Sequence, residues 1–152
     1  MTGSGNHYII KAFTELTAAE LYAILRLRNE VFVVEQKCIF QDADNKDIYC
    51  HHLMLYNNHQ LTAYARLVPP GISYCEMSVG RVVTSKESRN KGEGRELMKL
   101  AVKYCRELFG EGPIRIGAQY YLENFYSSIG FIPTGDVYDE DGIEHIEMIM
   151  YK

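Results

Sequence analysis

The chain has 152 residues, of which 47% are hydrophobic and 24% charged, which suits one domain with a single buried core. Its net charge is −4 without a basic stripe, and this disfavours a nucleic-acid partner. No apolar segment reaches membrane-spanning length and the four cysteines lack a Cys-x-x-Cys pair, so we expect free thiols, no membrane partner and a cytoplasmic location.

The first third of the chain predicts a strand, a helix and a long loop. Weak alternation over residues 7–13 is typical of an edge strand. Thr17 and Glu20 form a capping box, in which each side chain can bond the other residue's main-chain amide, so a helix should begin there. We expect this helix to break near Asn29 and a polar loop to occupy residues 36–47.

The middle of the chain alternates strands with one long helix. Two short apolar runs, 51–56 and 61–68, are separated by polar turn residues and predict a hairpin. A strand over 76–84 leads into a polar loop, and a helix with one apolar face follows Gly92. We expect that face to be buried through six residues, namely Leu97, Met98, Ala101, Cys105, Leu108 and Phe109.

The C-terminal part predicts shorter elements. A strand, a short helix, a turn and a final strand are expected at 114–118, 122–128, 139–142 and 143–151. Residues 1–6 are small and polar and suit a flexible arm, with residues 7–152 forming a single domain. This order of elements predicts the mixed α/β class.

Residues 80–94 are the most informative segment. A β-branched strand leads through a polar loop into Arg-x-x-Gly-x-Gly (Arg89, Gly92 and Gly94), directly before a helix. Main-chain amides and the positive end of the helix dipole meet there, which predicts a phosphate or pyrophosphate site. The lysine and hydroxyl of a nucleotide-hydrolysing loop are missing after Gly94, and Leu97 stands where a dinucleotide fingerprint has its third glycine.

This segment resembles the pyrophosphate loop of the GNAT superfamily of N-acetyltransferases, whose signature is Gln/Arg-x-x-Gly-x-Gly/Ala. Residues 119–131, which contain Phe-Tyr-x-x-x-Gly-Phe, resemble the C-terminal signature of the same superfamily. Residues 27–36 and 140–146 further resemble its ElaA-like branch, so the resemblance covers nearly the whole chain. Asn90 departs from the usual glycine, but asparagine tolerates the left-handed backbone almost as well.

The resemblance implies the GNAT-type acyl-CoA N-acyltransferase fold. Its mostly antiparallel sheet of about six or seven strands is splayed at the cofactor slot and flanked by about four helices. Acetyl-CoA would be the co-substrate, and no metal is expected. The strand before the loop would pair with the pantetheine, the loop would hold the pyrophosphate, and a further polar residue would touch the cofactor or cap a strand end. The matching positions are Val82, Val83 and Thr84, then Arg89, Asn90, Lys91, Gly92, Glu93, Gly94 and Arg95, then Gln119.

Three catalytic functions are implied by the same resemblance. Tyr126 matches the family's general acid, because a phenol stays protonated at neutral pH and can donate to the leaving sulfur; aromatic packing is the alternative. The main-chain amide of Val83 would donate to the oxyanion. Three candidates are left for the general base: His145, Glu35 and a chain of water molecules. An ordinary half-buried strand histidine would also explain His145, and a solvated helix end would also explain Glu35.

Charged residues in the strand at 76–84 and in two loops also affect which acceptor the site would favour. Alternation places Glu76 and Arg81 on opposite faces unless a bulge intervenes, and Arg81 could instead pair with a core carboxylate. The acidic residues within 42–47 and 139–141 are interpreted as solvated loops whose negative potential favours a cationic or amine-bearing acceptor.

The sequence therefore predicts an N-acetyltransferase that moves an acetyl group directly from the thioester to an amine within a ternary complex. The acceptor is a small-molecule or peptide amine, and a homodimer is possible. A catalytically silent CoA-binding sensor on the same fold is the alternative, and an unrelated phosphate-binding α/β domain is a third possibility.

Overall fold

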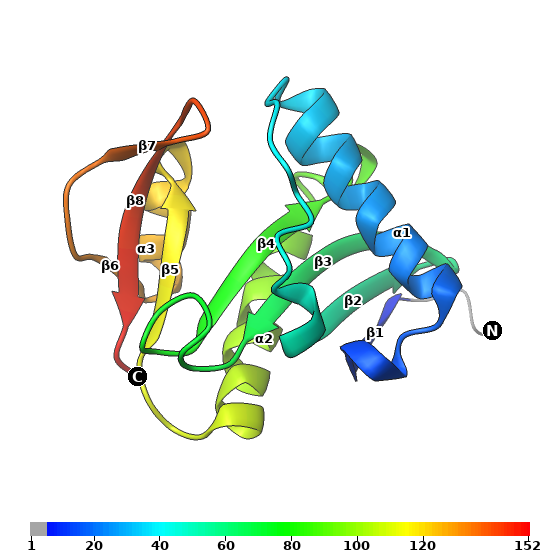
Figure 1. Cartoon of the computed structure of the whole chain (residues 1–152), viewed down its shortest axis with the longest axis horizontal. Coiled ribbons are helices and arrows are strands. Elements are labelled where there is room, and N and C mark those ends of the chain that lie inside the picture. The colour runs from blue at the N-terminus through cyan, green and yellow to red at the C-terminus, as the bar shows by residue number, and fades with distance from the viewer. Residues whose placement is uncertain (1–5) are drawn as a thin grey trace.

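The computed structural model describes residues 6–152 and is of the mixed α/β class, as predicted. Four antiparallel strands form the N-terminal sheet in the order β1-β2-β3-β4 (Figure 1); they span Asn6–Ala12, His51–Asn57, Gln60–Val68 and Ser78–Thr84. The predicted edge strand is confirmed, because among the strands of residues 6–152 β1 pairs with β2 alone. Of the expected arm, residues 1–5 lie outside the described residues, and Asn6 already belongs to β1.

The C-terminal sheet has the order β5-β8-β6, with β7 paired to the other end of β8. Its strands span Ile114–Gln119, Ile132–Pro133, Tyr138–Glu140 and Ile143–Met150 for β5 to β8. The two sheets touch through a single parallel bridge between Met77 and Ile114, where the Arg115 amide donates to the Met77 carbonyl at 3.0 Å. Beyond this point β4 and β5 diverge (Figure 1), which confirms the splay that the sequence resemblance implies.

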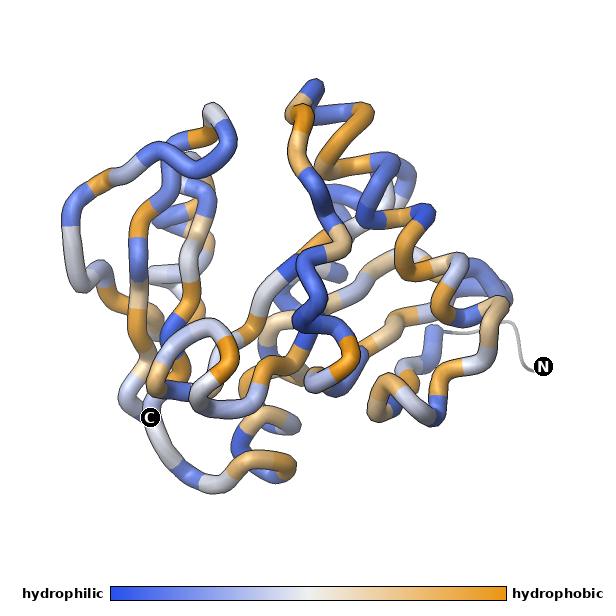
Figure 2. The backbone as a smooth tube through the Cα atoms, in the orientation of Figure 1, coloured by the Kyte–Doolittle hydropathy of each residue, from blue (hydrophilic) through white to orange (hydrophobic). Residues whose placement is uncertain are grey.

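Two helices cover opposite faces of the N-terminal sheet (Figure 1): α1, Ala18–Arg28, and α2, Glu93–Phe109. Successive side chains of β3 point to opposite faces of the sheet. Tyr64 therefore packs in the hydrophobic cluster that contains α1, while Ala63 and Ala65 pack in the cluster that contains α2. Both faces of the central strands are therefore largely buried, and Figure 2 shows hydrophobic stretches along these strands interrupted by hydrophilic positions.

The apolar face of α2 is confirmed for Leu97, Met98, Ala101 and Cys105, which are fully buried. The prediction for Leu108 is wrong, because its side chain is 41% exposed. Figure 1 shows the reason: the last turn of α2 extends beyond the strands that bury the earlier turns.

The start of α1 follows the predicted capping box. The Thr17 hydroxyl accepts from the Glu20 amide at 3.1 Å, and the Glu20 carboxylate accepts from the Thr17 amide at 2.9 Å. At the expected break the chain changes from α to π geometry over Asn29–Glu35. Such π segments shift the side chains that follow them and are frequent at functional sites.

The element counts differ slightly from the expectation. Over residues 6–152 there are eight strands and three α-helices, the third being α3, Glu123–Ile129. The additional strands β6 and β7 have two and three residues, which is too short for alternation to be recognised. Short 3₁₀ turns span Phe13–Glu15, Asp47–Tyr49, Lys86–Ser88 and Tyr120–Leu122. In this part of the chain, no helix combines the length and the apolar character needed to cross a membrane.

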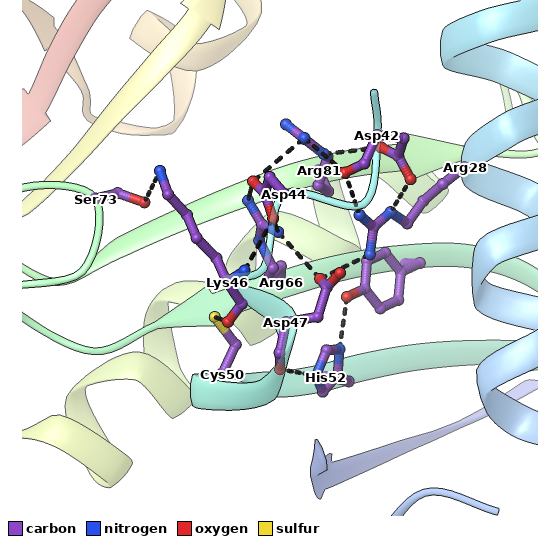
Figure 3. A network of polar contacts seen from close by, with 11 residues as sticks. Arg28, Asp42, Asp44, Lys46, Asp47, Cys50, His52, Arg66, Ser73 and Arg81 are labelled. Carbon is purple, nitrogen blue, oxygen red and sulfur yellow. Dashed lines mark hydrogen bonds and ion pairs between the residues drawn. The ribbon is translucent and has the colours of Figure 1, made fainter. Parts of the chain in front are cut away.

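A cluster of three arginines and three aspartates joins α1, β3 and β4 to the loop that follows the π segment (Figure 3). Arg28 is fully buried, and its Nη1 lies 2.8 Å from Asp47 Oδ1. Arg66 contacts both Asp47 and Asp44, at 3.0 and 2.8 Å. Burial alone would raise the pKa of Asp47, but the hydrogen bonds and charges of Arg28 and Arg66 outweigh it and lower the pKa.

The expectation of a solvated acidic loop at 42–47 is therefore wrong. Asp42 pairs with Arg28 and Arg81, each at 2.9 Å, so all three aspartates of the loop are bonded to arginines. Their negative potential is cancelled where it arises. The sequence could not reveal this pairing, because the partners come from three separate elements.

Removing one carboxylate from this cluster should destabilise the fold. We expect Asp47→Asn to lower the free energy of unfolding by about 3 kcal/mol, because it leaves the buried Arg28 without its closest partner. Urea unfolding measures this, with the exposed Asp136→Asn as the matched control that should stay within about 0.5 kcal/mol of wild type. Because the folded state lowers the pKa of Asp47, its contribution is present above pH ~4 and is lost as the pH falls further. Equal stability of the two variants would contradict the structural importance of the cluster.

Candidate functional site

The divergence of β4 and β5 opens a cleft with a volume of about 1130 Å³. Its walls come from both strands, from the π segment and the loop after it, from the loop before α2, and from α3 and β8. The cleft thus collects most of the residues that the sequence resemblance singled out. Those that border it are Glu35, Val82, Val83, Thr84, Arg89, Asn90, Gly92, Gly94, Arg95, Gln119, Tyr126 and His145.

A β-bulge interrupts β4 at the cleft. The pairing of β3 with β4 shifts register between Tyr64 and Arg66, and Arg81 has a left-handed backbone with φ +49°. This is the bulge on which the prediction for Arg81 depended. The Arg81 side chain borders the cleft and also pairs with Asp42 and Asp44. It therefore both faces the cleft and pairs with carboxylates, the two alternatives that the sequence offered.

The phase of the β3–β4 ladder decides which amides face the cleft. The Ser85 amide donates to the Thr62 carbonyl at 2.7 Å, so Thr62 and Ser85 form a hydrogen-bonded pair. Hydrogen-bonded and non-bonded pairs alternate in an antiparallel ladder, which puts Val83 in a bonded pair with Tyr64. The Val83 amide is therefore occupied within the sheet and does not fit the predicted oxyanion donor. The amides of its neighbours, Val82 and Thr84, face the cleft edge instead.

The loop before α2 has the backbone geometry that the predicted anion site requires. Gly92 is the N-cap of α2 with φ +79°, and Asn90 has φ +66°, so asparagine adopts the left-handed backbone expected at this position. The first amides of α2 have no partner within the helix, and they open toward the cleft where Gly94 and Arg95 border it. Two predicted positions turn away: Lys91 does not border the cleft, and Glu93 is buried toward a small pocket beside β1.

A strap, residues 35–40, borders the cleft and is fastened through its first two residues. Glu35 forms a two-point ion pair with Arg89, and its second contact, from Arg89 Nη2 to Glu35 Oε1, is 2.7 Å long. The side-chain amides of Gln36 and Gln119 each donate a hydrogen bond to the other, at 3.1 and 3.3 Å. The hydrogen bond from Arg89 is the main cause that lowers the pKa of Glu35, which makes this carboxylate a weak base.

Tyr126 lies at the inner wall of the cleft. Its ring packs edge-on against Phe125 and Phe131, with centroids 5.1 and 6.0 Å away, so the packing interpretation is realised. The same residue borders the cleft, which leaves the catalytic interpretation open as well. Burial raises the pKa of Tyr126, and the phenol therefore stays protonated at neutral pH.

His145 lies on β8 across the cleft from β4. Its Nδ1 is 2.8 Å from the Ile143 carbonyl, and because a carbonyl only accepts, Nδ1 carries the proton. In the neutral ring Nε2 is then free to accept a proton, and Glu140 lies 3.9 Å from it. A histidine held in one tautomer by a main-chain carbonyl is suited to general-base chemistry.

Sequence reasoning missed one part of the site. A Cβ on Gly117 of β5 would lie 2.9 Å from the hydroxyls of both Tyr74 and Tyr138, so only glycine lets these phenols reach the strand. An isolated glycine within a strand pattern was the available signal, since it often marks a close approach of another group. Two further polar residues of the cleft wall, Lys46 and Ser73, carried no recognisable motif.

Known proteins agree with this geometry. The family model described as "Acetyltransferase (GNAT) domain" matches residues 23–152. Protein ElaA of Escherichia coli (strain K12) is 42% identical over 137 residues, which cover 89% of this chain and 90% of ElaA. An acyl-CoA N-acyltransferase from Pseudomonas aeruginosa is similar in structure, with a TM-score of 0.89, 41% identity and coverage of 95% of this chain and 99% of that one. The ElaA crystal structure gives a TM-score of 0.86 at 37% identity, with 95% and 99% coverage.

Proposed function

Because the chain belongs to the GNAT acetyltransferase family, we propose that this acyltransferase moves an acetyl group from acetyl-CoA directly to an amine within a ternary complex. One observation carries the proposal: a single cleft joins the open amides before α2, the free edge of β4, a protonated tyrosine and a histidine with an unprotonated nitrogen. The free thiols of the chain suit the cytoplasm as its location.

In this proposal the cofactor lies along β4. The pyrophosphate binds the loop amides from Asn90 to Arg95 at the positive end of α2, and the pantetheine pairs with the unpaired edge of β4 through Thr84. The left-handed backbone of Asn90 and Gly92 supports the pyrophosphate contact. The hydrogen-bonded pair of Thr62 and Ser85 supports the pantetheine contact, because it leaves the Thr84 amide pointing away from β3. Arg89 is shared between this loop and Glu35, so it serves the strap as much as the cofactor.

The chemical step is then a direct displacement. His145 Nε2 takes a proton from the amine, directly or through a water molecule, and the nitrogen attacks the thioester carbonyl carbon. The Val82 amide, in place of the Val83 amide first expected, donates to the developing oxyanion. The C–S bond breaks, and the Tyr126 hydroxyl gives its proton to the leaving sulfur, which yields the amide and free CoA. Glu35 is not the base in this scheme, because the hydrogen bond from Arg89 lowers its pKa and makes the carboxylate a weak base.

Removing the proposed acid should slow the reaction without weakening cofactor binding. We expect Tyr126→Phe to lower kcat about 100-fold, because the thiolate would leave unprotonated, while the dissociation constant of CoA stays within about twofold. CoA release over a panel of amines and calorimetry with CoA measure the two quantities. Tyr151→Phe, an exposed tyrosine, is the matched control. Tight CoA binding by the wild type without turnover of any amine would favour the silent sensor instead.

The loop can be tested through its left-handed backbone. Gly92→Val should weaken CoA binding more than tenfold, because a β-branched residue at φ +79° costs about 1–2 kcal/mol or more and displaces the loop amides. Gly92→Asn tolerates this backbone and should stay within about threefold of wild type. Circular dichroism confirms that each variant is folded before calorimetry. Unchanged affinity in the valine variant would refute the placement of the pyrophosphate.

The proposed base can be tested by removing it. We expect His145→Gln to lower kcat/KM at neutral pH about 100-fold, because the amine would lose the group that takes its proton. His59→Asn, in the β2–β3 turn, is the control and should keep the wild-type kcat/KM. A wild-type kcat/KM in His145→Gln would assign the proton to water alone.

A further inference from the structure

On the wall of the cleft, the Lys46 ammonium has no carboxylate partner within the described part of the chain. Its side chain is half-buried and borders the cleft, and its Nζ lies 3.3 Å from the Ser73 hydroxyl. Figure 3 shows the side chain leaving the arginine–aspartate cluster and extending toward Ser73. Among residues 6–152, no ion pair involves Lys46.

The neighbouring carboxylates are already paired with arginines. Asp44 accepts from Arg66 and Arg81, while Asp42 and Asp47 each contact two arginines. The three aspartates therefore balance the three arginines, and Lys46 adds one positive charge that the cluster does not neutralise. A half-buried ammonium that has lost part of its hydration gains from an anion more than an exposed one does.

The opposite wall has the other sign. Glu140 reaches the cleft from β7, next to His145, and Glu140 makes no contact with an arginine or lysine in the described part of the chain. An acceptor amine placed at His145 for deprotonation would meet this carboxylate, whereas any group extending toward β3 and the loop before β4 would meet Lys46 and Ser73. The two walls therefore favour a molecule that carries a positive charge near Glu140 and a negative charge near Lys46.

We propose that the acceptor is an amine that also carries an anionic group, a carboxylate or a phosphate, and that Lys46 and Ser73 bind this group. The inference rests on the proposed N-acetyltransferase function and names its substrate class. The Lys46 ammonium supplies the charge and the Ser73 hydroxyl donates a second hydrogen bond, a combination that suits one anionic group. A purely cationic acceptor, which the acidic loops alone suggested, would be repelled at this end.

Four primary amines that differ mainly at the far end of a short chain test the proposal. They are 4-aminobutyrate, 3-aminopropylphosphonate, butylamine and 1,4-diaminobutane, each measured by CoA release from acetyl-CoA. We expect kcat/KM for the two anionic amines to exceed that for butylamine about tenfold or more, and the diamine to be the poorest. The ratio between the carboxylate and the phosphonate identifies which anion the site prefers.

Variants separate binding of the anion from general effects. Lys46→Gln should raise KM for the anionic amines about tenfold, leave kcat within about twofold, and leave the kinetics of butylamine unchanged. Lys46→Arg retains the charge and should restore most of the loss, and Ser73→Ala should give a smaller increase in KM. Lys99→Gln, an exposed lysine on α2, is the matched control.

The outcomes distinguish this inference from the function on which it rests. Equal or better use of butylamine or the diamine, or an unchanged KM for the anionic amines in Lys46→Gln, would overturn the anion site while leaving the acetyltransferase proposal intact. No CoA release with any of the four amines by wild-type protein that binds CoA would contradict the acetyltransferase proposal itself, and the inference with it.

Discussion

The divergence of β4 from β5 above the Met77–Ile114 bridge is the constraint on which the rest of the structure depends. Two strand edges that would normally pair are left facing each other across a cleft, and their open amides need partners from water or from a ligand. A thioester carrier with its own amide groups can occupy such a gap as an added strand. The bridge at one end fixes the angle between the two strands and so keeps the cleft open.

The arginine–aspartate cluster holds the other wall in place. Buried ion pairs contribute little net stability, because desolvation cancels most of their attraction, but they hold their partners in one arrangement. Here Arg28 from α1, Arg66 from β3 and Arg81 at the bulge all bond the loop after the π segment. The cluster therefore joins the bulge in β4 to the part of the cleft wall that contains Asp44 and Lys46, and it holds both in one arrangement.

Two side chains of the candidate site combine an observed structural contact with a proposed chemical role. Tyr126 packs between two phenylalanines, and its burial raises the pKa of the hydroxyl that we propose as the acid. Arg89 belongs to the proposed cofactor loop, yet its guanidinium also pairs with Glu35 and so fastens the strap at the cleft. An interpretation as packing or pairing is therefore no argument against a function at the same residue.

The sequence by itself determined what depends on neighbouring residues. The Thr17–Glu20 capping box, the left-handed turn at Asn90 and Gly92, and the buried stripe of α2 are local consequences of side-chain chemistry, backbone preference and helical period. Only the tertiary structure decided the ladder phase that occupies the Val83 amide, the arginine partners of the 42–47 loop and the exposure of Leu108. Each of these depends on which distant strand or helix lies alongside and in which register, and no local pattern in the chain carries that information.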